Sequence, residues 1–169
     1  MNELKEIYAD NNNWLNFAEL KNGALLAISL ALFEVVIDII VIPVLQIFLI
    51  CMNGIVILIC CISFIPFLNN NDIIKKLAVQ HYSIKYSNSL DSKNIVFYIN
   101  IFLSSEAQYK SAIQKATNKT NGFNLMEENY INQIRAISTI SAIKYYLFSI
   151  AMNLFLVCLV VFIIVLITA

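Results

Sequence analysis

The sequence predicts a mainly α-helical membrane protein with three transmembrane helices, an N-terminal hairpin plus a C-terminal span, and a small, mostly helical cytoplasmic domain. Of its 169 residues, 60% are hydrophobic and 13% are charged, whereas soluble domains average about 45–50% apolar and about 25% charged residues. The apolar residues gather in two blocks, 23–68 and 145–169, separated by a polar stretch of 76 residues, 69–144. This pattern argues against an ordinary soluble domain.

The first apolar block is long enough for two membrane crossings. Its 46 residues would extend about 69 Å as a helix, roughly twice a hydrocarbon core of about 30 Å. We place the turn between Glu34 and Gln46, because Asp38 and Pro43 in this interval favour water or an irregular backbone. The second span then covers about residues 44–67. Residues 1–22 precede this hairpin as a cytoplasmic N-terminal helix.

The second apolar block and the charge distribution set the expected topology. Residues 145–169 carry no charge and reach about 37 Å if helical, enough for a third span. The segment 69–144 contains nine Lys or Arg and five Asp or Glu residues, so the positive-inside rule places it in the cytoplasm together with the N-terminus. Trp14, Tyr145 and Tyr146 are the expected interfacial anchors.

The first half of the cytoplasmic segment has weaker signals than the second half. Asp72 can cap a short helix whose apolar pattern fades by His81, and residues 83–94 have the composition of a loop. Residues 94–103 form a short apolar run in which periodicity does not distinguish a buried strand from a buried helix.

Two capping signals organise the second half of this segment. Ser105 and Gln108 have the spacing of a capping box for a helix that runs to about Asn118, and residues 120–122 break it. Asn124 and Glu127 repeat the signal and open a helix that can continue into the third span.

The sequence indicates no enzyme. It has three glycines and one histidine, and it lacks a phosphate-binding glycine loop, a Gly-x-Ser-x-Gly motif and any Cys–His or metal-ligand spacing. We therefore expect neither a catalytic nor a metal site. A net charge of zero gives no indication of nucleic-acid binding. No structural disulfide is expected either, because every cysteine lies in an apolar block: Cys51, Cys60, Cys61 and Cys158.

Polar residues next to the spans are the candidate functional residues. Lys21 and Lys144 have two interpretations: each extends to lipid headgroups at a helix end, or together they form a cationic pocket for a small anion. Asn22 and Gln133 could then form hydrogen bonds with the polar edges of this ligand. Gln133 and Lys144 are eleven residues apart, which is about 16 Å along a helix, so one mononucleotide could hardly touch both within a single protomer.

Other residues have a functional and a plainer structural interpretation. Glu34 and Asp38 share a helix face and could mark an ion path, but a position in or beside the outer turn is favoured. Phe97 and Tyr98 could stack on a base, although aromatic residues in an apolar run are more often core residues.

Three separated stretches resemble the Pycsar effector domain family. Residues 14–26, which include Ala18, Glu19 and Lys21, resemble its opening motif, with Glu19 in place of the usual Asp. Residues 94–101 followed by 105–109 are similar to its apolar run and acidic, aromatic helix start. The third stretch matches its Gln-Ile, Ser-x-Ile and Lys-Tyr pattern at Gln133, Ile134, Ser138, Ile140, Lys144 and Tyr145.

The resemblance implies a bacterial antiphage effector in the inner membrane. Such a protein senses cyclic UMP or cyclic CMP, made by a partner uridylate or cytidylate cyclase, and then disrupts the lipid bilayer to abort infection. It needs no cofactor besides this ligand, binds no nucleic acid and forms a homo-oligomer. The ligand-binding residues it suggests are Glu19, Lys21, Asn22, Tyr98, Gln133, Ser138 and Lys144.

As a hypothesis, Lys21 and Lys144 neutralise the phosphate, Asn22 and Gln133 contact the base or ribose, and Tyr98 stacks. The long distance from Gln133 to Lys144 suggests a pocket between protomers. The alternative is a small integral membrane protein that binds a protein partner, such as a bacteriocin-immunity protein. A constitutive, holin-like pore is less favoured because the 76-residue polar segment exceeds what a pore needs.

Overall fold

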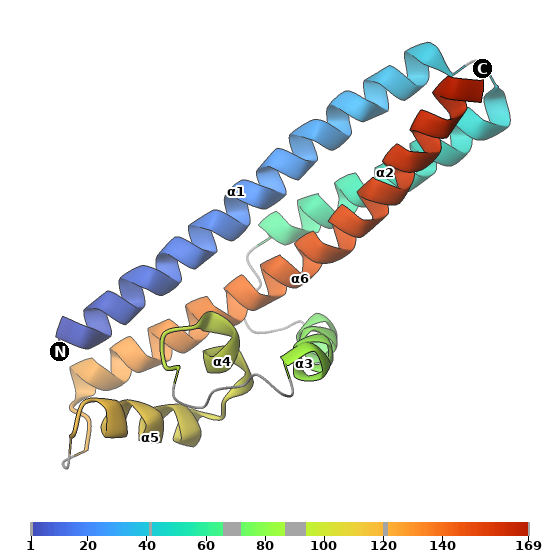
Figure 1. Ribbon diagram of the computed structural model, residues 1–169. Helices are drawn as coiled ribbons and strands as arrows, with labels where there is room; N and C mark the ends of the chain where they lie inside the picture. Colours follow the sequence, from blue (N-terminus) through green and yellow to red (C-terminus); the bar gives the residue numbers. More distant parts are fainter. Residues whose placement is uncertain (1, 41, 66–71, 87–93, 120–121, 169) are drawn as a thin grey trace. The chain divides into compact units, whose positions relative to one another are not determined.

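The computed structural model describes residues 2–40, 42–65, 72–86, 94–119 and 122–168. All regular structure in these ranges is helical. The helices are α1 (Asn2–Ile39), α2 (Pro43–Phe64), α3 (Asp72–Tyr86), α4 (Tyr98–Leu103), α5 (Glu106–Ala116) and α6 (Leu125–Thr168). Figure 1 shows α1 and α6 each as one unbroken helix.

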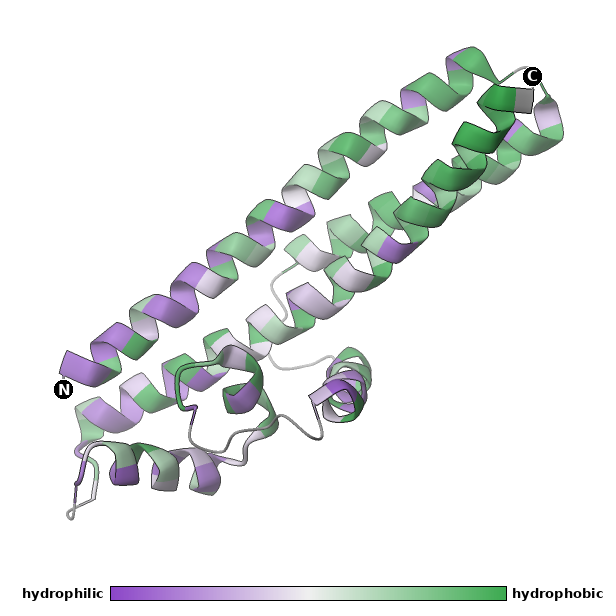
Figure 2. Cartoon of the chain, in the orientation of Figure 1, coloured by the Kyte–Doolittle hydropathy of each residue, from purple (hydrophilic) through white to green (hydrophobic). Residues whose placement is uncertain are grey.

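Three of these helices, α1, α2 and α6, are long and apolar enough to cross a membrane. This confirms the predicted fold class. The first turn falls inside the expected interval, because α1 ends at Ile39 and α2 begins at Pro43, where a proline is tolerated in the first turn of a helix. Hydrophobic residues dominate α2 and the C-terminal parts of α1 and α6 (Figure 2).

The chain divides into two compact units. The polar unit comprises Met1–Phe17 and Phe67–Ile143, and the membrane unit comprises Ala18–Pro66 and Lys144–Ala169. Both α1 and α6 contribute to both units: the polar N-terminal part of each helix belongs to the polar unit, and the apolar C-terminal part belongs to the membrane unit.

The membrane unit packs one face of each helix against the other two. Its core contains Leu32 of α1, Leu49 of α2 and Phe155 of α6, with many other apolar side chains around them. Most remaining large apolar side chains of these helices point outward and are exposed, as expected for helices that contact lipid tails rather than water. Polar contacts also lie inside, such as the hydrogen bond that Asn53 Nδ2 donates to the carbonyl oxygen of Ser29 at 2.7 Å.

The polar unit has its own apolar core, formed by α1, α5 and α6 with part of α4. Its fully or nearly fully buried members are Leu4, Ile7, Ile101, Tyr109, Ile113, Ile131 and Ile134. The ambiguous run at residues 94–103 is helical from Tyr98 onward. Asn94 holds the turn that precedes this helix, because its Oδ1 accepts hydrogen bonds from the backbone N–H groups of Val96 and Phe97.

Both predicted capping signals are confirmed. Ser105 Oγ accepts from the Gln108 N–H at 3.2 Å, and Gln108 Oε1 accepts from the Ser105 N–H at 2.9 Å. Asn124 and Glu127 exchange the same pair of bonds, both at 2.9 Å. These reciprocal bonds satisfy N–H groups that a helix start leaves unpaired. The second box opens α6, which continues unbroken into the third span as expected.

The predicted loop at residues 83–94 is wrong at its start, because α3 continues to Tyr86. The last turn of α3 is held by a tertiary contact that no local pattern reveals. Tyr82 is buried and its hydroxyl donates to the carbonyl oxygen of Ala142 at 3.1 Å. Residues 87–93 of the predicted loop, the expected end of the second span at 66–67 and the helix break at 120–121 lie outside the described residues.

Trp14, expected as an interfacial anchor, packs within the polar unit. Its ring centroid lies 6.2 Å from that of Phe97 and 5.5 Å from that of Tyr98. The side chain keeps 38% of its surface exposed.

Acidification is expected to weaken the start of α6. The ion pair with Lys119 and the hydrogen bond from the Asn124 N–H hold the pKa of Glu127 below its ordinary 4.5. A carboxyl whose pKa is depressed on folding stabilises the fold above its unfolded pKa, and this contribution is lost as the pH falls through the folded pKa. The protection factors of residues 124–130, which compare the measured exchange with intrinsic exchange at the same pH, should therefore fall below about pH 4.5 in the wild type, and less so in Glu127→Gln.

The control for this experiment is Glu3→Gln, because Glu3 is exposed in the first turn of α1. This variant should retain the full acid response at residues 124–130. An equal acid response in Glu127→Gln and the wild type would contradict the assignment.

Candidate functional site

Four of the candidate residues lie in the membrane unit, at the start of the apolar parts of α1 and α6. We call Glu19, Lys21, Asn22 and Lys144 the juxtamembrane cluster. Lys144 Nζ lies 2.7 Å from Glu19 Oε1. Lys144 is only 4% exposed, and the side chain of Glu19 is 46% exposed. The ion pair therefore joins a buried ammonium to a carboxylate that water can reach.

Asn22 connects the same two helices. It is fully buried, and its Nδ2 donates to the carbonyl oxygens of Ala18 at 2.9 Å and Lys144 at 3.5 Å. Its Oδ1 is buried without a hydrogen-bond partner among the described residues. An unsatisfied buried acceptor costs about 1–3 kcal/mol, so this oxygen is available to a donor that enters the cluster.

Lys21 lies among aromatic rings of α6. Its Nζ is 5.4 Å from the ring centroid of Tyr145 and 5.7 Å from that of Phe148, within the range of cation–π attraction. A third ring is close to the other ammonium, since Lys144 Nζ is 6.0 Å from the centroid of Phe64. The cluster thus contains two ammonium groups and one carboxylate beside apolar rings, which suits it to a small organic anion.

The other candidate residues belong to the polar unit. Ser138 is fully buried and its Oγ donates to Asn11 Oδ1 at 2.7 Å. Tyr98 is 7% exposed and packs on Trp14, which favours the interpretation as a core residue. Gln133 is exposed on α6. Glu19, Asn22 and Lys144 are therefore in contact, with Lys21 beside them on α1, and the ligand roles of all seven candidate residues stay predictions.

The polar unit also contains a cavity that the sequence did not indicate. Its volume is about 920 Å³, and it lies beside α4 and α5, where the polar side chains at its wall include Asn94, Asn100, Ser104, Gln108, Ser111 and Lys115. Ligand pockets for small molecules occupy about 300–1,000 Å³. No sequence signal could have located it, because its wall combines a helix, a capping box and the turn before α4.

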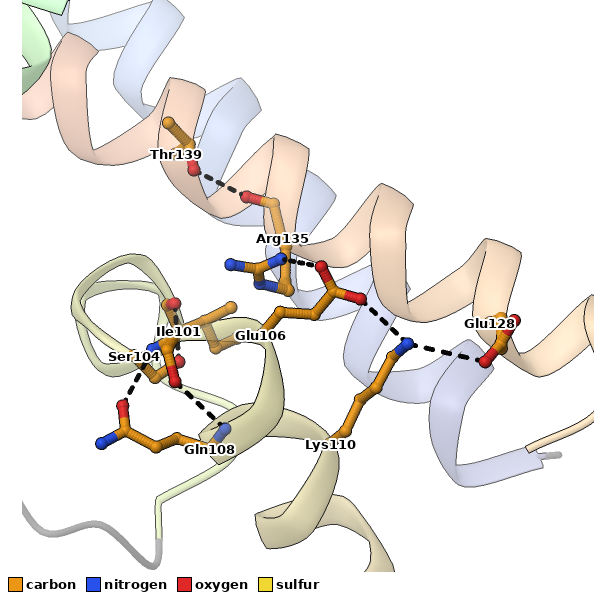
Figure 3. A network of polar contacts seen from close by, with 9 residues as sticks. Ile101, Ser104, Glu106, Gln108, Lys110, Glu128, Arg135 and Thr139 are labelled. Atoms are coloured by element: carbon orange, nitrogen blue, oxygen red, sulfur yellow. Dashed lines mark hydrogen bonds and ion pairs between the residues drawn. The ribbon is translucent and has the colours of Figure 1, made fainter. Parts of the chain in front are cut away.

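An ion-pair network secures α5 against α6 (Figure 3). Glu106 lies 2.9 Å from Lys110 and 3.3 Å from Arg135, and Lys110 lies 3.5 Å from Glu128. The interaction with Lys110 lowers the pKa of Glu106, and the same contact raises the pKa of Lys110. These partly exposed ion pairs orient α5, and the cavity is lined by other residues of that helix.

Together these features define a mainly α-helical membrane protein with three candidate spans and a separate helical polar unit. The chain belongs to the family of the Pycsar effector protein domain, whose family model matches residues 3–169, essentially the whole chain. Membership in this family implies an effector of antiphage defence. No curated protein and no solved structure matches the chain.

Proposed function

We propose that this protein binds cyclic UMP or cyclic CMP at the juxtamembrane cluster and then disrupts the bacterial inner membrane, which aborts infection. The family match supports an effector that responds to a cyclase product. The observation that carries the choice of site is the contact between α1 and α6 at the cluster: Asn22, whose Oδ1 is buried without a partner among the described residues, bonds to Lys144, and its neighbour Lys21 lies against the rings of Tyr145 and Phe148. The family match also favours this function over the partner-binding alternative.

The chemistry of the ligand fits these groups. The cyclic phosphate carries one negative charge and would replace the Glu19 carboxylate beside Lys144, with Lys21 as a second cation. The Asn22 amide oxygen would accept from the ring N–H of uracil or the amino group of cytosine. The rings beside Lys21 offer an apolar surface to the base.

Binding would act by shifting a conformational equilibrium. Asn22 is fully buried, so the ligand must favour an arrangement in which α1 and α6 separate at the cluster. The shift is limited by the difference in affinity between the two arrangements. Because α1 and α6 are both continuous through the cluster, a change there would move two transmembrane helices and alter their packing in the bilayer.

The proposal includes a topology. Residues 1–22 and 69–144 lie in the cytoplasm, residues 23–68 and 145–169 lie in the membrane, and the C-terminus is outside. This orientation gives the cluster access to a cytoplasmic messenger. Protease added to sealed inverted vesicles should cut the segment 69–144, and cleavage only from the periplasmic side would reject the arrangement.

Replacing Lys21 with Ala is expected to weaken nucleotide binding about 10-fold or more, since a hydrogen bond to a charged group contributes about 1.5–3 kcal/mol. The measurement is equilibrium binding of cyclic UMP and cyclic CMP to the purified full chain in lipid nanodiscs. Lys76→Ala is the matched control because Lys76 is exposed on α3. Unchanged binding in Lys21→Ala with loss in Lys115→Ala would place the ligand in the cavity beside α5 instead.

The same variant separates the functional alternatives in cells. Expression alone should leave the membrane intact, and supplied nucleotide should trigger depolarisation in the wild type but not in Lys21→Ala at equal membrane abundance. Depolarisation without nucleotide would indicate a constitutive pore. Intact membranes under both conditions would support a protein that binds a partner.

A further inference from the structure

An exposed asparagine lies in the middle of the third span. Asn153 is nine residues after Lys144 on α6, which is about 14 Å along the helix and close to the centre of a hydrocarbon core of about 30 Å. Its side chain is exposed, and no hydrogen bond joins its amide to the described residues. Lipid tails offer neither donors nor acceptors, so an exposed amide at this depth requires a partner.

Asn153 belongs to a regular stripe on the outer face of α6. Leu156, Val160, Ile163 and Ile167 follow it at alternating spacings of three and four residues, and their exposures are 49%, 55%, 45% and 78%. This is the spacing of the a and d positions of a heptad, with Asn153, Val160 and Ile167 at a. A lone asparagine at an a position characteristically sets the register of paired helices.

The stripe is distinct from the face of α6 that packs inside the membrane unit. Ala151, Phe155, Cys158, Phe162 and Val165 point into the core shared with α1 and α2. Helix α6 therefore has one apolar face occupied within the protomer and a second, regularly spaced face directed to the bilayer. The second face is the one that carries the unpartnered amide.

We propose that copies of this chain associate in the membrane through the stripe Asn153, Leu156, Val160, Ile163 and Ile167, with the Asn153 amides hydrogen-bonded to one another. A second copy inserted in the same orientation presents Asn153 at the same depth by symmetry. The carboxamide both donates and accepts, so two copies can satisfy each other reciprocally. The inference rests on the membrane placement proposed above and not on the nucleotide.

The first test measures self-association of the full chain in lipid vesicles. Energy transfer between labelled copies is followed as lipid is added to dilute the protein. Asn153→Leu is expected to weaken association about 3- to 30-fold, the range for interhelical hydrogen bonds in membranes, and Asn153→Gln should restore most of it. Asn13→Leu, which makes the same change at an exposed position in the polar half of α1, should have no effect.

A cysteine cross-link gives a second measurement that does not depend on Asn153. Cys51 and Cys61 are exposed and are replaced with Ser, while Cys60 and Cys158 are buried and remain. In this background Val160→Cys should form covalent dimers with a membrane-permeant oxidant. Leu166→Cys should not, because Leu166, although exposed, is six residues from Val160 and therefore about 120° away from it around the helix.

Equal association of Asn153→Leu and the wild type would contradict the proposal that copies of the chain associate through the stripe. Equal cross-linking at positions 160 and 166 would contradict it as well. Both assays contain no nucleotide. A negative result therefore leaves nucleotide binding at the juxtamembrane cluster untouched, whereas loss of nucleotide binding with intact association rejects the proposed function alone.

Discussion

Replacing Ile131 with Ala is expected to destabilise the polar unit by about 2–5 kcal/mol, the range for an aliphatic side chain truncated to Ala in a close-packed core. Ile131 is fully buried on α6 among side chains of α1 and α5. Its removal leaves a cavity whose walls are held by three helices and so cannot collapse fully. Trp14 is the only tryptophan and lies in this unit, so its fluorescence reports the unfolding.

The measurement is a urea titration of the full chain in nanodiscs, in which the midpoint of the Trp14 signal is compared between variants. Ile84→Ala is the matched control, because Ile84 is 73% exposed on α3 and a surface truncation changes stability by about 0.5 kcal/mol or less. Equal midpoints for the two variants would show that the core centred on Ile131 is not formed.

Replacing Glu19 with Gln should destabilise the membrane unit by about 1–3 kcal/mol. The change removes the carboxylate from Lys144, whose side chain is 6% exposed. Breaking a fully buried pair costs about 3–5 kcal/mol, and we reduce this figure because solvent screens the half-exposed Glu19. Unfolding in mixed micelles by added dodecyl sulfate, followed by helical ellipticity, measures the effect.

Two further variants test the interpretation of this ion pair. The double variant Glu19→Leu with Lys144→Met should recover much of the lost stability, because an apolar pair leaves no buried charge without a partner. Glu6→Gln, at an exposed position of α1, should behave as the wild type. A Glu19→Gln variant as stable as the wild type would mean that the pair contributes nothing to the membrane unit.

The Glu19→Gln variant also has a functional consequence. In the proposed mechanism the carboxylate competes with the ligand phosphate for Lys144. Its neutral replacement should therefore tighten binding of cyclic UMP or cyclic CMP while it weakens the resting bundle. Weaker nucleotide binding in this variant would indicate that Glu19 itself contacts the ligand rather than occupying the position of its phosphate.

The sequence by itself determined the features that depend on local composition. An uncharged run of the length of a bilayer must be helical in lipid, because only a helix satisfies all its backbone hydrogen bonds internally. The capping boxes at Ser105 and Asn124 could also be predicted from the sequence, since the two bonded residues of each box are only three positions apart. The single break between the first two spans followed from Pro43 in the same way.

The tertiary structure decided everything that depends on which face of a helix meets which neighbour. The pairing of Glu19 with Lys144 joins residues 125 positions apart, and the last turn of α3 depends on a contact of Tyr82 with Ala142. Apolar residues occupy every side of the C-terminal half of α6, so its hydropathy cannot distinguish the face inside the bundle from the face directed to lipid. Only packing against α1 and α2 separates them, because close contact excludes solvent from one side and leaves Asn153 on the other.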